Sequence, residues 1–203
     1  MGATALLLWA TLTGPAQAAR QPPDYREDLV RAAVQHAEQL NAAGQYEDAI
    51  AFARAFQRTV TRDGDVAYEI AFAYNRMAKL EDALDAYGDV LELDPGNAAA
   101  LYDRGEIRLA LGRDALALAD LEAAARLRPD HWVVYFRLAE LAGKRGDPSA
   151  FEEHLTDALR HGFDLRTLVK DPTWRGWFRD PTLGPVLQKL VTVYGDETML
   201  EGL

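Results

Sequence analysis

The chain has 203 residues, of which 49% are hydrophobic and 27% are charged, a composition typical of a folded domain of ordinary size. Its formal net charge of −10 disfavours binding to a phosphate backbone, because that affinity comes from clustered Lys and Arg. No cysteine is present, so disulfides, thiolate metal sites and cysteine nucleophiles are excluded. Nucleic acid is therefore not expected among its partners.

The first 18 residues have the pattern of a secretory signal peptide. An apolar run at 3–12 is followed by a Gly14-Pro15 break and by Ala-Gln-Ala at 16–18, a small-x-small cleavage pattern. No basic residue precedes the run, which departs from the usual pattern. About ten apolar residues are too few to span a bilayer. The expectation is a cleaved leader at 1–18, no membrane span, and a periplasmic or secreted protein, with a cytoplasmic N-terminal segment as the alternative.

A pattern with a fixed period follows. Pro95 in LELDPGN and Pro129 in ARLRPDH both end a helix-like run, and they lie 34 residues apart. With this period the chain divides, without insertions, into four units: 30–63, 64–97, 98–131 and 132–165. The strong bias to Arg over Lys and the many alanines also indicate a GC-rich genome, and hence a bacterium.

Small residues recur at three positions of these units. Where two helices of a unit come closest, the residues are Ala37, Ala71, Gly105 and Ala139. In the turn between the helices they are Gly44, Ala78, Gly112 and Gly146. In the middle of the second helix they are Ala49, Ala83, Ala117 and, as an exception, Phe151. Small residues at these sites let paired helices pack closely.

In these features the chain resembles the tetratricopeptide repeat (TPR) family. The resemblance implies an all-α fold, a right-handed superhelical solenoid of antiparallel helix pairs with about 3.5 to 4 repeats, over residues 24–165. Two residues depart from the pattern. Arg108 stands at an apolar position, and we expect its stem to lie on the core with the guanidinium outside. The bulk of Phe151 should push the last helix pair apart.

Residues 166–203 form a tail in which the period is lost. Asp171-Pro172 and Asp180-Pro181 each combine a capping Asp with a first-turn Pro, which predicts two helix starts. The first helix would hold three aromatic residues, Trp174, Trp177 and Phe178. The second would run from Thr182 to about Tyr194 with one apolar face. We expect these helices to cap the solenoid, with an aromatic ligand box as the alternative.

No pattern in the chain supports catalysis. The single serine, Ser149, lies at a predicted helix start, and no glycine-rich phosphate loop is present. Carboxylate pairs such as Glu152-Glu153 are typical of solvated helix faces. We therefore expect no enzyme and no cofactor.

One group of residues has metal-ligand chemistry. His154, Asp157 and His161 share one side of the last repeat helix, where they could hold a divalent metal. Positions i and i+7 are about 10.5 Å apart along a helix, however, which is far for one ion. A polar face with His161 at the negative helix end is favoured, and no metal site is expected.

The TPR resemblance places the functional surface on the concave face. In this family, ligand contacts commonly come from positions 2, 5, 9, 12 and 13 of the first helix of each unit. Position 5 gives Val34, Tyr68, Tyr102 and Phe136. Position 9 gives Glu38, Phe72, Glu106 and Glu140. Positions 12 and 13 of the second unit give Asn75 and Arg76.

An aromatic stripe beside glutamates favours an apolar or basic segment of a partner protein, with core packing of the aromatics as the alternative. Val34 and Glu38 stand where the carboxylate-clamp subclass of TPR domains has Lys and Asn, so a clamp for a terminal carboxylate is not expected. The resulting hypothesis is a non-catalytic protein–protein interaction scaffold or assembly accessory of the bacterial envelope. The alternatives are an accessory subunit that docks through its aromatic tail, and a small-ligand or metal-binding envelope protein. The sequence does not identify the partner or the oligomeric state.

Overall fold

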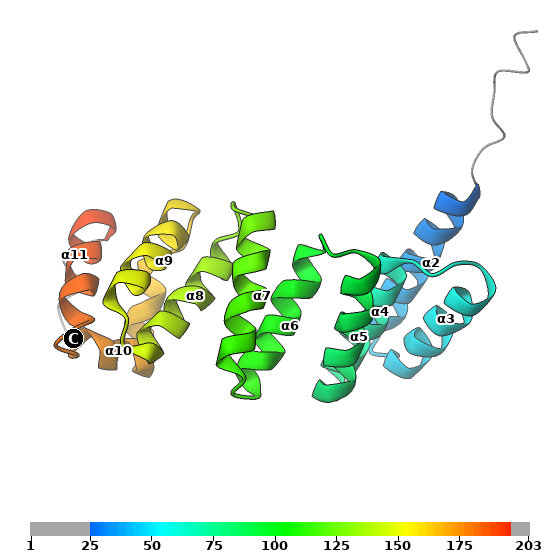
Figure 1. Ribbon diagram of the computed structural model, residues 1–203, viewed down its shortest axis with the longest axis horizontal. Helices are drawn as coiled ribbons and strands as arrows, with labels where there is room; N and C mark the ends of the chain where they lie inside the picture. The colour runs from blue at the N-terminus through cyan, green and yellow to red at the C-terminus, as the bar shows by residue number, and fades with distance from the viewer. Residues whose placement is uncertain (1–24, 196–203) are drawn as a thin grey trace, which may run out of the picture.

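The computed structural model describes residues 25–195, and this part of the chain contains ten α-helices, one 3-10 helix and no β-strand. Eight of the helices form four stacked pairs: α2 (Tyr25–Ala42) with α3 (Tyr46–Thr59), α4 (Gly64–Arg76) with α5 (Leu80–Leu93), α6 (Ala98–Ala110) with α7 (Asp114–Leu127), and α8 (Trp132–Arg145) with α9 (Pro148–Arg160). The array is elongated, with α2 at one end and α11 at the other (Figure 1). The predicted signal peptide at 1–18 lies outside the described residues.

The turn inside each pair has a left-handed residue at the position that the sequence predicts. The φ angles are 74° at Gly44, 57° at Ala78, 70° at Gly112 and 67° at Gly146. Glycine adopts this conformation without steric cost, whereas alanine does not. The turn prediction is confirmed, and Ala78 is the one position where the conformation is strained.

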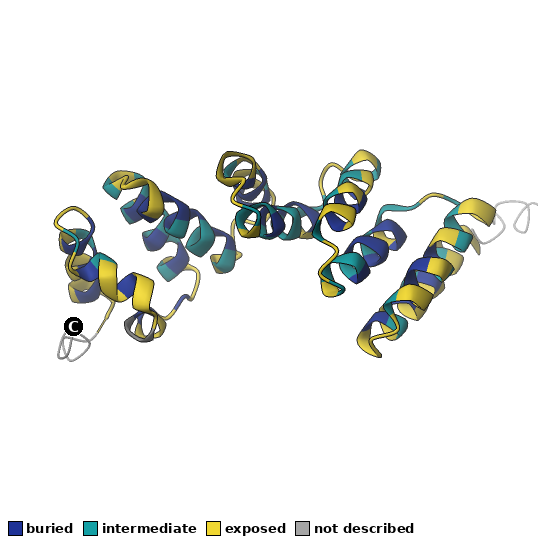
Figure 2. Cartoon of the chain, turned by 90° about the horizontal axis from the view of Figure 1, so that it is seen from below, coloured by how far each residue is buried: buried dark blue, intermediate teal, exposed yellow. Residues whose placement is uncertain are grey.

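Small residues allow the close approach of the paired helices. Ala37, Ala71 and Ala139 are completely buried, and a Cβ atom on Gly105 would lie only 3.1 Å from Cγ of Leu121. Buried residues gather on the helix sides that face neighbouring helices, while exposed residues cover the outer sides (Figure 2). Each pair therefore buries its apolar side against the next pair, as a repeat array requires.

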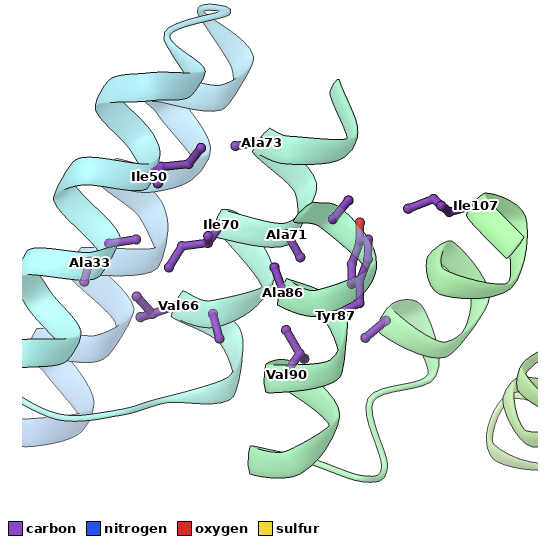
Figure 3. Close-up of a cluster of buried hydrophobic side chains, with 14 residues drawn as sticks. Ala33, Ile50, Val66, Ile70, Ala71, Ala73, Ala86, Tyr87, Val90 and Ile107 are labelled. Carbon is purple, nitrogen blue, oxygen red and sulfur yellow. The ribbon is translucent and has the colours of Figure 1, made fainter. Parts of the chain in front are cut away.

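The core of the first two pairs extends into the third. Ile70, Ala71, Tyr87 and Val90 lie between the α2–α3 pair and α6, and Ile107 of α6 approaches from the far side (Figure 3). All five side chains are at most 8% exposed. The apolar contacts are thus continuous from one repeat to the next.

Arg108 differs from its predicted environment. Its Nη1 lies 2.6 Å from Oδ2 of Asp120, whose side chain is 5% exposed, and Arg104 donates to the same carboxylate through Nε at 2.9 Å and Nη2 at 2.7 Å. The prediction that the Arg108 guanidinium lies outside is wrong, because a buried carboxylate on the facing helix α7 draws it inward. The repeat pattern of the sequence did not reveal Asp120.

Phe151 also differs from its prediction, because it does not separate the last helix pair. Helices α8 and α9 pack as extensively as α4 and α5. The Phe151 ring is completely buried and contacts the tail, with ring centroids 5.5 Å from Trp174 and 5.6 Å from Trp177. The bulky residue thus fills space between the last repeat and the tail.

The tail consists of the 3-10 helix η1 (Leu165–Lys170), α10 (Pro172–Phe178) and α11 (Gly184–Tyr194). Asp171 caps α10 as predicted, accepting a hydrogen bond from the Thr173 amide at 2.7 Å. Asp180 instead caps a turn, with the amides of Thr182 and Leu183 at 2.8 and 2.9 Å. Helix α11 therefore begins two residues later than predicted.

Five aromatic rings form what we call the tail core: Phe136, Phe151, Phe163, Trp174 and Trp177. Trp174 is 1% exposed, and its ring lies 4.7 Å from that of Trp177. The indole of Trp177 covers Gly143 of α8, where an added Cβ would lie 2.8 Å from the ring. Helix α11 completes the cover with buried side chains at Leu187, Leu190 and Val191.

Candidate interaction groove

Adjoining hollows follow the face built by the first helices of the repeats. The first, of about 360 Å³, lies between α2 and α4 and is lined by Glu38, Asn41, Ala42, Tyr46, Tyr68, Glu69, Phe72 and Arg76. The second shares Glu38, Tyr68 and Glu69 with it and adds Val34, Asp65, Asn97 and Ala99. A third begins at Tyr68 and continues past Tyr102 and Asp103 to His131 and Val134. We call this line of hollows the groove.

Six of the ten predicted contact residues line the groove: Val34, Glu38, Tyr68, Phe72, Arg76 and Tyr102. The other four have partners inside the protein. Asn75 lies beside Tyr87, where it opposes the rise that burial causes in the pKa of the Tyr87 hydroxyl. The remaining three, Glu106, Phe136 and Glu140, lie on α6 and α8.

Phe136 belongs to the tail core. Its ring stacks on Trp174, with centroids 5.2 Å apart and an interplanar angle of 18°, and it lies 4.7 Å from Phe163. The prediction that Phe136 continues the aromatic stripe of the groove is therefore corrected, because the tail provides a larger apolar surface for this ring. The stripe consists of Tyr68, Phe72 and Tyr102.

The two glutamates of the last repeats share one arginine. Arg137 Nη2 lies 2.9 Å from Oε2 of Glu106, and its Nη1 lies 2.6 Å from Oε2 of Glu140. Burial nevertheless raises the pKa of Glu106, against the effect of Arg137. The predicted row of free glutamates therefore does not extend to this end of the groove. Periodicity did not reveal Arg137, which reaches back to the previous repeat.

The opposite end of the groove keeps its negative charge. Glu38, Asp65 and Glu69 form no ion pair with any residue of the described part of the chain. Burial raises the pKa of Glu69, and the nearby carboxylates of Glu38 and Asp65 raise it further, while a hydrogen bond from Asn41 lowers it. Burial also raises the pKa of Asp65, next to Asp63 and Asp94. This concentration of unpaired carboxylates favours a positively charged group.

Asp103 joins the second repeat to the third beneath the groove. Tyr68 and Tyr87 donate their hydroxyls to Oδ2 of Asp103, at 2.5 and 3.0 Å. Burial raises the pKa of Asp103, although both hydrogen bonds lower it. The Tyr68 ring thus lines the groove while its hydroxyl fixes the neighbouring repeat. The repeat pattern did not predict this role, although the Asp next to Tyr102 in the sequence is a signal for it.

The histidine group lies apart from the groove. The His161 ring stacks on Tyr135 with centroids 5.5 Å apart, and its Nδ1 lies 2.8 Å from the backbone oxygen of Asp157. The Asp157 carboxylate pairs with Arg160 at 3.3 Å. Across residues 25–195, no three His, Asp or Glu side chains come together as metal ligands. A search of the same residues for a helix that could cross a bilayer found none.

Comparisons with known proteins show which architecture this is. A family model described as "Tetratricopeptide repeat" matches residues 98–131, the third unit. A tetratricopeptide repeat and J domain-containing co-chaperone of Cryptococcus neoformans var. grubii is 37% identical over 65 residues, which are 32% of this chain and 12% of that protein. This chain thus matches only about an eighth of that relative.

Solved structures share the fold at low sequence identity. MamA from Desulfovibrio magneticus RS-1 superposes with a TM-score of 0.65 at 18% identity, over 80% of this chain and 92% of that chain. YrrB, described as a TPR protein with an unusual peptide-binding site, gives 0.64 at 16% identity over 82% and 87%. PilF of Pseudomonas aeruginosa gives 0.60 at 17% identity over 87% and 96%. At these identities the likeness shows the fold alone.

Proposed function

We propose that this chain, which is a tetratricopeptide repeat protein, is a non-catalytic scaffold that holds an extended segment of a partner protein in the groove from α2 to α6. The TPR fold supports a role in protein–protein interaction. The observation that carries the finer proposal is the unpaired acidic end of the groove, next to the aromatic side chains of Tyr68, Phe72 and Tyr102. This combination fits a segment with basic and apolar residues.

We place the scaffold in the envelope of a bacterium, either periplasmic or secreted. The support is the leader-like pattern at 1–18 and the Arg- and Ala-rich composition. Fractionation of the producing cell, with mass spectrometry of the N-terminus, tests this placement. A mature protein that begins at Ala19 in the envelope fraction is expected, and an uncleaved protein in the cytoplasm would contradict it.

Charge reversal tests the groove. In a pull-down from envelope extracts, Glu38→Lys should abolish capture of the partner, because Glu38 lines the acidic hollows. The matched control is Glu122→Lys on α7, which makes the same charge change at an exposed site outside these hollows. Equal loss in both variants would show that net charge, and not the groove, determines capture.

The alternatives have less support. Docking through the tail aromatics would require Trp174, which is 1% exposed, to leave the tail core. A small-ligand box made of the same rings is filled by their mutual packing. The histidine face uses its groups in local contacts. The groove brings aromatic side chains together with carboxylates that form no ion pair in the described part of the chain.

A further inference from the structure

The hollow between α2 and α4 contains a buried amide with an unused acceptor. Asn41 is 4% exposed, and its Nδ2 donates to Oε2 of Glu69 at 2.7 Å and to the Glu69 backbone oxygen at 3.1 Å. These bonds use both N–H donors. Oδ1 of Asn41 is buried and has no hydrogen-bond partner among residues 25–195. A buried acceptor left in this state destabilises the fold, and a donor that reaches it on entering the hollow would restore a hydrogen bond.

The charges around Asn41 select the kind of donor. Glu69 is 7% exposed and uses one carboxylate oxygen for Asn41, and Glu38 lines the same hollow without an ion pair in the described chain. The cation of the hollow, Arg76, donates from Nε to the Tyr46 hydroxyl at 3.5 Å. The carboxylates of Glu38 and Glu69 therefore outnumber the one cation of the hollow, and Asn41, with its unpartnered oxygen, lies in the same wall.

The walls of the hollow are suited to an aliphatic stem. Tyr68, Phe72 and Tyr46 line it together with the acidic groups. Lysine and arginine bury their methylene groups on apolar surface while the head group keeps polar contacts. Aromatic faces also attract a cation electrostatically. The volume of about 360 Å³ accommodates one such side chain.

We propose that this hollow is a cation pocket that takes one lysine or arginine side chain of the bound segment, with Asn41 Oδ1, Glu69 and Glu38 as acceptors. The proposal rests on the proposed function, because the side chain belongs to the segment held in the groove. It adds a defined position along that segment where a positive charge is required. It also explains why α2 buries the polar residue Asn41. An apolar residue at this position would pack without leaving a buried oxygen that lacks a hydrogen bond.

The pocket is tested first without any peptide. The probes are n-butylammonium, n-propylguanidinium and neutral n-pentanol, titrated into ¹⁵N-labelled protein while the Asn41 side-chain amide is followed by NMR. Both cations, or one of them if the pocket distinguishes ammonium from guanidinium, should shift this signal to saturation, and n-pentanol should not. Glu69→Gln should weaken the binding at least tenfold. The matched control Glu122→Gln should leave it unchanged.

Two results would overturn the pocket: no saturable shift at Asn41 with either cation, or an equal response to n-pentanol. If Glu69→Gln lowers the helical circular dichroism, Glu38→Gln replaces it. Glu38 is exposed and forms no side-chain hydrogen bond within the described residues, so the variant should fold and bind the cation about threefold more weakly. Unchanged binding in a folded Glu38→Gln protein would also contradict the proposal.

A second experiment separates the pocket from the function. A random heptapeptide display library is selected on wild-type protein. We expect enriched peptides to carry Lys or Arg at one fixed position, and expect this preference to vanish in selection on Glu69→Gln. A different result would contradict the pocket but support the scaffold: the enriched peptides carry no basic residue, and their enrichment disappears when the selection is repeated on Tyr102→Ala. If no selected peptide loses binding when the groove is mutated, the scaffold proposal is contradicted. The titration with the two cations then tests the pocket independently of the scaffold.

Discussion

Replacing Trp174 with alanine should unfold the C-terminal end of the array and leave the other end folded. The indole is 1% exposed and packs on Phe136 at 5.2 Å, Phe151 at 5.5 Å and Trp177 at 4.7 Å. Burying a Trp side chain of about 200 Å² stabilises by about 5 kcal/mol at 25 cal/mol/Å². Removing it leaves a cavity, and buried Trp→Ala changes cost about 3–5 kcal/mol. We expect a loss in this range.

The loss should be local, because each repeat contacts only its neighbours. Hydrogen exchange followed by mass spectrometry resolves this along the chain. Amides in α9, α10 and α11 should lose protection, whereas those in α2 to α5 should keep it. The control is Trp132→Ala, since Trp132 is 36% exposed and its ring touches Phe163 at 5.3 Å. That variant should cost about 1 kcal/mol. A Trp174→Ala loss below about 1 kcal/mol, or equal deprotection at both ends, would refute the capping role of the tail.

Three further predictions concern the repeats themselves. Ala78→Gly should raise the free energy of unfolding by about 0.5–1 kcal/mol in urea titrations, because φ is 57° there, and Gly112→Ala at φ 70° should lower it by a similar amount. Asp120→Ala should cost about 3–5 kcal/mol, since it leaves Arg104 and Arg108 facing a buried site without their carboxylate; a change under 1 kcal/mol would contradict the burial of this group. Asp103→Asn should alter the pH dependence of stability. Because burial raises the pKa of Asp103 above 3.8, the folded protein binds this proton more tightly than the unfolded chain does. The resulting stability is fully present below pH 3.8 and is lost as the pH rises through the raised pKa. The free energy of unfolding of wild type relative to Asp103→Asn should therefore fall over that interval, and a difference independent of pH would contradict the assignment.

Sequence periodicity located the features that depend on the backbone. The turn residue must be left-handed and the closest helix contact must be small in every unit, so Gly44 and Ala71 could be placed by counting. Ala78 shows the strength of this constraint, because an alanine takes the left-handed conformation where the repeat demands it. The helix cap at Asp171 likewise depends on residues within one turn of each other.

Periodicity failed where side chains reach other repeats or the tail. Arg137 contacts Glu106, 31 positions earlier, and thereby cancels a charge that counting had assigned to the groove. Phe136 packs against Trp174 of the tail and does not line the groove as its repeat position predicts. The repeat period could not predict this contact, because α10 lies outside the repeats. Asp120 pulls Arg108 inward across the pair. These pairings depend on side-chain reach and burial, which a single unit of the pattern does not determine.

Photocrosslinking tests most directly whether the groove is the interaction surface. The photoreactive amino acid p-benzoylphenylalanine is placed either at Phe72 in the groove or at Tyr194, which is 43% exposed on the outer end of α11. Both variants are expressed in the native cell and irradiated, and crosslinked proteins are identified by mass spectrometry. The account predicts a partner protein linked at position 72 through a segment that contains Lys or Arg, and none at position 194. A partner linked only at position 194 would contradict it and identify the tail as the docking surface.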